Sequence, residues 1–342
     1  MNATLTNEAE LEDLLSAPLD ADVRAMRELP GDLIVLGAGG KMGPSLVRRA
    51  RRAVEAAGVR KRVIAVARFS EAGLADRLQR EGIEVLATDL LAPGALADLP
   101  DCPNVIFMAA RKFGTSGQEG LTWAMNTYLP GQVAERFRHA RLVAFSTGNV
   151  YPLSPVTGGG SVEADAPAPV GEYAQSALGR ERMFEHFSSV HGTRVALLRL
   201  NYAIDLRYGI LLDVAQKVWQ RQAVNVGMPA INVIWQGDAN SICLRAFEMA
   251  DSPPLKLNVT GPETVSVRWL AREFAQRFGT EVSLEGVEAG TALLSNAARC
   301  HRHFGYPSVS LQQMIDWVAD WVQRGGRTLG KPTQFEQREG QF

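Results

Sequence analysis

The chain has 342 residues and a mass of 37.2 kDa, with 36 lysine and arginine residues against 37 aspartate and glutamate residues. This length allows one large or two medium-sized domains. The balanced charge excludes a strong long-range attraction to nucleic acid or to anionic membranes, so we expect a small-molecule partner.

The cysteines and the first residues indicate the compartment. The chain has an odd number of cysteines, Cys102, Cys243 and Cys300, and they show no C-x-x-C spacing. Neither a disulfide framework nor a structural zinc site is therefore expected. Residues 1–30 are acidic at their start and helical in pattern, unlike a secretory signal, and no later run reaches 18 apolar residues. We expect a soluble cytoplasmic protein with an N-terminal helical extension over residues 1–30 and no membrane partner.

The first informative element is a strand over residues 32–36, followed by a glycine-rich turn and a helix that begins near residue 44. Glycines at such a turn let backbone amides approach a pyrophosphate and direct a helix N-terminus at its charge. A glycine-rich turn without a ligand is the alternative. The turn residues expected to bind a dinucleotide are Gly37, Gly39, Gly40, Lys41, Met42 and Gly43.

A second strand, predicted over residues 62–67, ends at Arg68, where the adenosine ribose of a dinucleotide would lie. An acidic residue there favours a free 2′-hydroxyl group, whereas arginine suits a 2′-phosphate. The sequence therefore favours NADP over NAD, although a solvated arginine after a strand is also consistent with it.

A third strand is predicted over residues 82–90, with Asp89 and Leu90 at its end. Asp89 can accept a hydrogen bond from the adenine amino group or can simply cap the end of the strand. We therefore expect Asp89 and Leu90 on the adenine side of the cofactor.

Two more buried strands are predicted over residues 104–110 and 141–147, with helical stretches between them. Strands that alternate with helices indicate an α/β fold with a doubly wound parallel sheet. Ser146 and Thr147 end the fifth strand and so face the crevice at the carboxyl ends of the strands. Residues 152–171 are rich in proline and glycine and predict a long loop beside that crevice.

Taken in order, these motifs resemble the extended short-chain dehydrogenase/reductase family, the NAD-dependent epimerase/dehydratase group. The matching positions are Gly37, Gly40, Gly43, Asp89, residues 107–110, Asn126, residues 145–151, Tyr173, and residues 198–202, 234–239 and 257–261. The resemblance implies a Rossmann domain over residues 31–201 that also receives about 230–260, and an interleaved substrate-binding domain over 202–342.

The resemblance also implies roles for individual residues. Tyr173 and Thr147, with Ser146 beside them, would act at the reacting oxygen. Ala109, Ala110 and Asn126 would lie on the cofactor side. On the substrate side we expect Asn201 and Arg207. The apolar stripes of the helices over residues 122–138 and 173–189 would form a homodimer interface, but burial in a monomer core explains the same stripes.

The chain departs from the family at one position, because Ala177 stands where the Tyr-x-x-x-Lys motif has its lysine. A cation about 4 Å from the phenol is worth on the order of 4 kcal/mol at an effective dielectric constant near 20, or about three pKa units. Without it, tyrosine can still donate a proton but is a poor base. Arg180, Lys112 and Lys41 are the candidate substitutes, and each is also consistent with a surface or phosphate-binding role.

Three functions agree with these observations. The first is an NAD(P)-dependent oxidoreductase, epimerase or dehydratase that acts on a sugar or nucleotide sugar. The second is a non-catalytic NAD(P) sensor, and the third is a lyase or isomerase that uses the same cleft. His301 and His303 alternate as they would on one strand face, yet no carboxylate cluster accompanies them and we expect no metal site.

Overall fold

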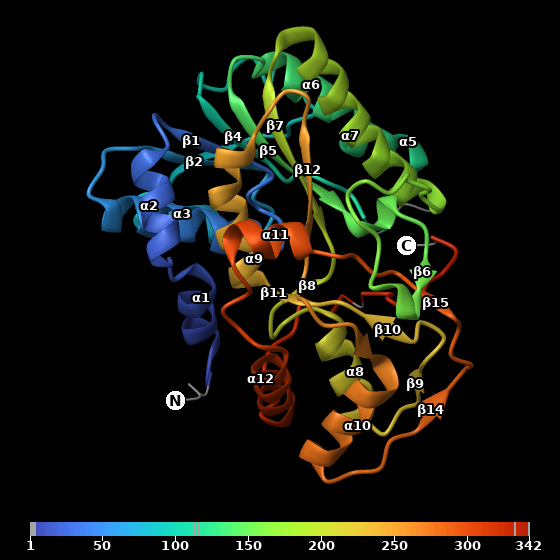
Figure 1. Ribbon diagram of the computed structural model, residues 1–342. Coiled ribbons are helices and arrows are strands. Elements are labelled where there is room, and N and C mark those ends of the chain that lie inside the picture. Colours follow the sequence, from blue (N-terminus) through green and yellow to red (C-terminus); the bar gives the residue numbers. More distant parts are fainter. Residues whose placement is uncertain (1–4, 113, 115–116, 332, 341–342) are drawn as a thin grey trace.

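The computed structural model describes residues 5–112, 114, 117–331 and 333–340, and its centre is a seven-stranded parallel sheet (Figure 1). The strand order is β12-β7-β5-β4-β1-β2-β3, and every neighbouring pair is parallel. This confirms the predicted α/β fold. The strands are β1 (Leu33–Leu36), β2 (Val63–Ala67), β3 (Glu84–Ala87), β4 (Asn104–Phe107), β5 (Arg141–Thr147), β7 (Arg194–Leu200) and β12 (Leu255–Val259).

Strand β1 shows why the central strands are continuous apolar runs. Leu33 and Val35 pack on one side of the sheet with α3 (Gly43–Ala57), α2 (Asp20–Glu28) and α9 (Gln236–Arg245). Ile34 and Leu36 pack on the other side with α6 (Leu129–Arg136) and α7 (Gly171–His191). Because both faces are covered, every position of the strand is buried.

The order of the strands reverses at β1, which has β2 on one side and β4 on the other. In doubly wound sheets a ligand crevice lies outside the carboxyl ends of the strands at such a point. The remaining helices around the sheet are α1 (Glu8–Ser16), α4 (Leu74–Arg80), α5 (Glu119–Trp123) and α11 (Ala298–Phe304), with a π-helical turn (Ala124–Tyr128) between α5 and α6. Within the described ranges, no helix has both the length and the apolar character needed to cross a membrane.

A second lobe lies beyond the carboxyl ends of the strands and is built around α8 (Ile210–Trp219), α10 (Val267–Phe278) and α12 (Leu311–Gln323) (Figure 1). Apolar faces of these three helices share one core, which also contains Trp235 and Trp317. Short strand pairs complete it. They are β8 (Ala203–Ile204) with β11 (Ile234–Trp235), β9 (Val224–Asn225) with β14 (Leu284–Glu285), β10 (Ala230–Ile231) with β13 (Val265–Ser266), and β6 (Ser154–Pro155) with β15 (Thr291–Ala292).

The segment after α12 returns along the second lobe to the start of α7. The backbone N–H of Leu329 donates to the carbonyl oxygen of Arg207 at 2.9 Å, and the Thr333 hydroxyl donates to Asp213 at 2.5 Å. Phe335 is buried in the lobe core, and Gly340 packs against Gly171. We call residues 324–331 and 333–340 the C-terminal tail.

Candidate active site

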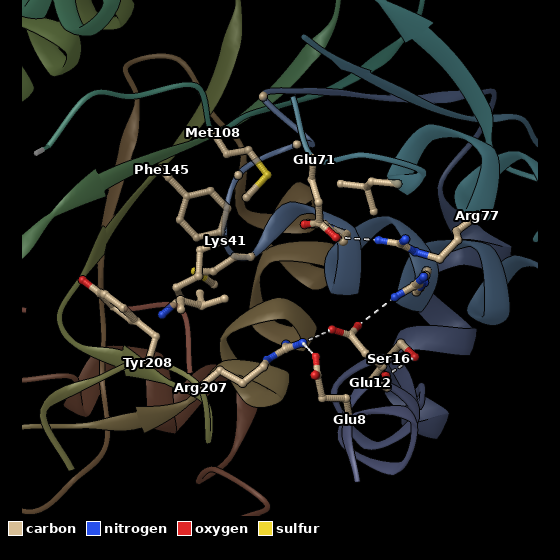
Figure 2. A pocket seen from close by; sticks show the side chains of 18 of the residues that line it. Glu8, Glu12, Ser16, Lys41, Glu71, Arg77, Met108, Phe145, Arg207 and Tyr208 are labelled. Carbon is tan, nitrogen blue, oxygen red and sulfur yellow. Dashed lines mark hydrogen bonds and ion pairs between the residues drawn. The ribbon is translucent and has the colours of Figure 1, made fainter. Parts of the chain in front are cut away.

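A crevice of about 1500 Å³ opens at the carboxyl ends of the strands, between the sheet and the second lobe (Figure 2). The glycine turn forms one wall, and the ends of β4 and β5 form its floor through Met108, Ala110, Phe145 and Ser146. Tyr173 and Arg180 of α7 also line it. The crevice thus joins most of the predicted glycine-turn residues to Ser146 and Tyr173, two of the three predicted catalytic residues.

The glycine turn is shaped by close backbone approaches. Gly37 has φ +96°, and a Cβ atom there would lie 2.5 Å from the backbone nitrogen of Ala109. A Cβ on Gly43 would lie 2.2 Å from the carbonyl oxygen of Ala38, so the first turn of α3 needs glycine as well. Gly40 has no atom nearer than 3.6 Å to such a position. The turn and the helix N-terminus therefore fit a dinucleotide pyrophosphate, with open space at Gly40 that a side chain would fill.

Lys41 belongs to this turn, but its side chain extends toward the second lobe (Figure 2). Its Nζ donates to the carbonyl oxygen of Ala203 at 2.8 Å and lies 4.2 Å from the ring centre of Tyr208. Burial lowers the pKa of Lys41 to about 8.

Tyr173 and Thr147 come together from α7 and from the end of β5. Tyr173 is 8 % exposed, and the Thr147 side chain adjoins its phenol. Burial raises the pKa of Tyr173 above the ordinary value of 10.0, while the charge of Arg180 and the Thr147 side chain act in the opposite direction. The Thr147 Oγ1 is fixed by Asn149, which donates from its backbone N–H at 3.2 Å and its side chain at 3.0 Å. A smaller cavity that adjoins this crevice therefore holds both hydroxyls, and the phenol is protonated at neutral pH.

Ser146 lines the crevice too, but its hydroxyl donates to the buried carboxylate of Glu181 at 2.5 Å. Glu181 is also bonded by Arg199, through Nε at 2.9 Å and Nη2 at 2.7 Å. The Nη1 of Arg199 donates to the Tyr151 hydroxyl at 2.6 Å, which in turn donates to Asn258 at 2.9 Å. This buried chain of polar groups connects α7, β5, β7 and β12 behind the crevice.

Asn126 lies in the π-helical turn, fully buried behind the crevice. Its Oδ1 accepts from the backbone N–H of Arg111 at 2.8 Å and from Arg180 at 3.1 Å. Its Nδ2 donates to the carbonyl oxygen of Arg111 at 2.8 Å and to Ser176 at 3.0 Å. All of its polar capacity is thus used within the chain, and it holds the loop after β4 against α7.

One interpretation of the sequence placed the Arg180 side chain on the protein surface, and the structure shows that this is wrong. The side chain is 2 % exposed and its guanidinium lies between β5 and the π-helical turn. Lys112, the second candidate cation, has its Nζ 5.9 Å from the ring centre of Tyr173, and burial lowers its pKa to about 8.

The residues predicted on the adenosine side lie apart from these groups. Arg68 and Asp89 are exposed just beyond the ends of β2 and β3, and neither lines the large crevice. The Asp89 Oδ1 accepts from the backbone N–H of Leu91 at 3.0 Å, as in a strand-end cap. Leu90 and Ala109 are buried in the same core.

Asn201, predicted on the substrate side, lines the smaller cavity, of about 150 Å³, together with Tyr202, Tyr208 and Thr333 among others. Asn201 Nδ2 donates to the carbonyl oxygen of Leu293 at 3.4 Å. Arg207 lines the large crevice, where it is paired with Glu12 at 2.5 Å and Asp205 at 3.0 Å (Figure 2).

Two segments that line the large crevice were not predicted to do so from the sequence. Helix α1 lines the crevice through Glu8 and Glu12, and the C-terminal tail contributes Arg327, Leu329 and Lys331. The only signal for α1 was its row of carboxylates, which is complementary to arginines of α3 and the second lobe. Nothing in the sequence of the tail indicated its position.

The expected strand face for His301 and His303 is wrong, because both lie on the short helix α11. This segment is rich in alanine and arginine and has no β-branched residue, which favours a helix. His301 contacts the carbonyl oxygen of Thr260 at 3.0 Å, and His303 pairs with Glu248 at 2.8 Å. Across the part of the chain that the structure describes, no three His, Cys, Asp or Glu residues are grouped to hold a metal ion.

No protein-family model and no curated protein matches this sequence. Solved structures of nucleotide-sugar epimerases show the same fold. UDP-glucuronic acid 4-epimerase from Bacillus cereus, with UDP-glucuronic acid and NAD, is 17 % identical with a TM-score of 0.70 over 86 % of this chain and 99 % of its own. UDP-glucose 4-epimerase from Thermotoga maritima, with UDP-glucose, is 17 % identical with a TM-score of 0.69 over the same shares.

UDP-glucose 4-epimerase from Thermus thermophilus, in complex with NAD, is 18 % identical with a TM-score of 0.67 over 85 % of this chain and 99 % of its own. This chain therefore has the fold of the nucleotide-sugar epimerases, which confirms the resemblance that the sequence motifs indicated. At this level of identity the comparison establishes the fold alone.

Proposed function

We propose that the protein is an NAD(P)-dependent oxidoreductase of the epimerase/dehydratase type, acting on a sugar or nucleotide sugar. The observation that carries this proposal is that Tyr173 and Thr147 adjoin each other beside the glycine turn: Tyr173 lines the large crevice, and both line the smaller cavity with Lys41 and Met42 of the turn. The similar structures contain NAD and UDP-sugars, which supports the same classes of ligand here.

The residues of the crevice fit a nicotinamide dinucleotide, whose chemistry when bound is hydride transfer. The turn from Gly37 to Gly43 and the N-terminus of α3 would hold its pyrophosphate. Ala110 and Met108 would border the nicotinamide end, next to Tyr173. Arg68 and Asp89 would lie on the adenosine side.

The two hydroxyls set the direction of the proton chemistry. Thr147 would orient the substrate oxygen, and Tyr173 would donate its proton to that oxygen. Because burial keeps the pKa of Tyr173 above 10.0, the phenol is protonated at neutral pH and is competent as an acid. The site therefore favours reduction of a carbonyl group over oxidation of an alcohol.

A non-catalytic dinucleotide sensor is the second candidate. Ala177 in place of lysine and the raised pKa of Tyr173 favour it, because both weaken a base. A fluorescence titration with NADH and NADPH, followed by a search for turnover with UDP-glucose and UDP-glucuronic acid, distinguishes the candidates. Binding without turnover supports the sensor, and binding of neither cofactor rejects both.

The cofactor preference should depend on Arg68. We expect NADPH to bind more tightly than NADH, and Arg68→Asp to reverse that order because a carboxylate repels the 2′-phosphate. A change of roughly ten-fold or more in the affinity ratio corresponds to about 1.4 kcal/mol. The exposed Arg60→Asp variant is the matched control for charge reversal near β2. An unchanged ratio in Arg68→Asp would show that the arginine does not select the cofactor.

We also propose that the protein is a homodimer. Leu129, Val133 and Phe184 of the two apolar stripes are buried in the monomer core, whereas Trp123 is 38 % and Tyr128 61 % exposed on the neighbouring face. Such exposed aromatic residues are typical of protein interfaces. Sedimentation should give twice the monomer mass of 37.2 kDa, and the monomer mass alone would contradict the proposal.

A further inference from the structure

The guanidinium of Arg180 is a buried positive charge, and among the described residues its hydrogen bonds reach only neutral acceptors. Its Nη1 donates to the carbonyl oxygen of Phe145 at 2.7 Å, and its Nη2 donates to the amide oxygen of Asn126 at 3.1 Å. Its Nε is buried without a hydrogen-bond partner in the described structure. Burying a charge in this way is costly unless an anion forms nearby.

The neighbouring carboxylate of Glu181 balances this charge only in part. Glu181 is fully buried, but both of its oxygens are bonded by Arg199 and one also accepts from Ser146. Glu181 is therefore engaged chiefly with Arg199. Its charge also acts on Arg180, but it ranks after the charge of Tyr173, so the guanidinium of Arg180 remains available to the phenol.

The position of Arg180 on α7 directs this charge toward Tyr173. Helical side chains tilt toward the N-terminus and cover the preceding turn, so a long side chain at 180 extends over position 177. Ala177 is fully buried and contributes only a methyl group there. Phe145, Tyr173 and Arg180 all line the crevice, and the charge of Arg180 acts on the Tyr173 phenol.

We propose that Arg180 replaces the absent lysine and stabilises the negative charge that forms on Tyr173 when its proton leaves, reaching one turn back along α7 over Ala177. In that step the phenolic O–H bond breaks, the proton bonds to the substrate oxygen, and the electron pair stays on the Tyr173 oxygen. This inference rests on the proposed function, since the substrate oxygen belongs to that reaction. Arg180 acts through Tyr173 and is a positioning residue.

Several other groups face Tyr173, and they differ from Arg180 in charge or in the pH at which they are charged. Thr147 and Tyr208 are neutral hydroxyls, and burial raises the pKa of Tyr208. Lys112 and Lys41 line the same cavities, but each has a pKa lowered to about 8. Both lysines are therefore largely neutral at the pH where a buried tyrosine ionises. Burial lowers the pKa of Arg180 too, but from 12.5, and the charges of Tyr173 and Glu181 oppose that shift, so the guanidinium keeps its charge over this range.

The test is a direct titration of position 173, which needs no turnover. A difluorotyrosine placed at position 173 has a more acidic phenol than tyrosine, and its ionisation is followed by fluorine NMR. In Arg180→Met the midpoint should rise by about one pH unit or more, a change of ten-fold or more in acidity. Lys112→Met and the exposed Arg182→Met, on the same helix, should leave it nearly unchanged.

Two further variants keep the result decisive if Arg180→Met folds poorly. In Arg180→Lys the ionisation midpoint at position 173 should stay close to its value in the protein with Arg180. Combining Ala177→Lys with Arg180→Met should bring the midpoint back down, because the new lysine supplies the charge one turn earlier on the helix. An unchanged midpoint in Arg180→Met, or an equal rise in Lys112→Met, would overturn the inference. NADH titrations of the same variants show separately whether the cofactor site is intact, so loss of the proposed function is distinguished from loss of this coupling.

Discussion

Replacing Tyr173 by phenylalanine is expected to lower turnover by about 10²- to 10⁴-fold, the usual contribution of a positioned proton donor. The phenol is held beside Thr147 and is the acidic group of that hydroxyl pair, so its loss removes the proton that the reacting oxygen must receive. The measurement is the rate of reduced-nicotinamide consumption or formation with the sugar that wild-type protein converts. Cofactor affinity, measured by fluorescence, should change by less than about two-fold because the ring remains in place.

Tyr306→Phe is the matched control, since this tyrosine is 75 % exposed and lies on the segment that follows α11. It should leave both turnover and affinity at the wild-type level. Turnover in Tyr173→Phe within a factor of two of wild type would remove this phenol from the chemistry. Equal losses of affinity and turnover would instead indicate a change in packing.

The largest effect on stability is expected from Glu181→Gln. The substitution leaves the guanidinium of Arg199 buried with no anion, and breaking such a pair costs about 3–5 kcal/mol. That cost is a large part of the stability of a typical domain. The midpoint of urea unfolding, followed by tryptophan fluorescence, should therefore fall sharply.

The control is Glu55→Gln, which breaks the exposed pair of Glu55 with Arg51 on α3. Its expected cost is below about 0.5 kcal/mol, as for other exposed helix pairs. The double variant Glu181→Leu with Arg199→Met should recover most of the loss, because it removes both charges together. If the double variant were as unstable as Glu181→Gln, the loss would come from packing or from the bond to Tyr151 instead.

The sheet could be predicted from the sequence because its central strands are apolar runs between glycines and polar residues. The prediction over residues 141–147 agrees with β5 at both ends, and the one over 62–67 differs from β2 by a single residue. Strands covered on both faces give continuous hydrophobic runs that are hard to mistake. The glycine turn was equally readable, since Gly37 and Gly43 each stand where a Cβ atom would clash.

The rest of the site could not be predicted, because it is formed by contacts between residues that are far apart in the sequence. The spacing placed Arg180 on the same helix face as Ala177, but charged residues are usually exposed, so its burial was not predicted. The carbonyl oxygen of Phe145 and the amide of Asn126 that receive it come from other elements. The tail likewise has no periodicity, and its position follows from individual anchors such as Phe335.

The tail has a consequence for how the molecule is made on the ribosome. The sheet strands β1 to β5 and β7 leave the exit tunnel early and can pair while synthesis continues, since domains begin to fold from the N-terminal side. Leu329 and Thr333, which wall the cavities, and Gly340, which packs on the first turn of α7, emerge more than a hundred residues after Tyr173. A nascent chain can thus hold a paired sheet while its crevice still lacks a wall and the apolar site of Phe335 is uncovered. During that interval the exposed apolar surface makes the growing polypeptide prone to aggregation.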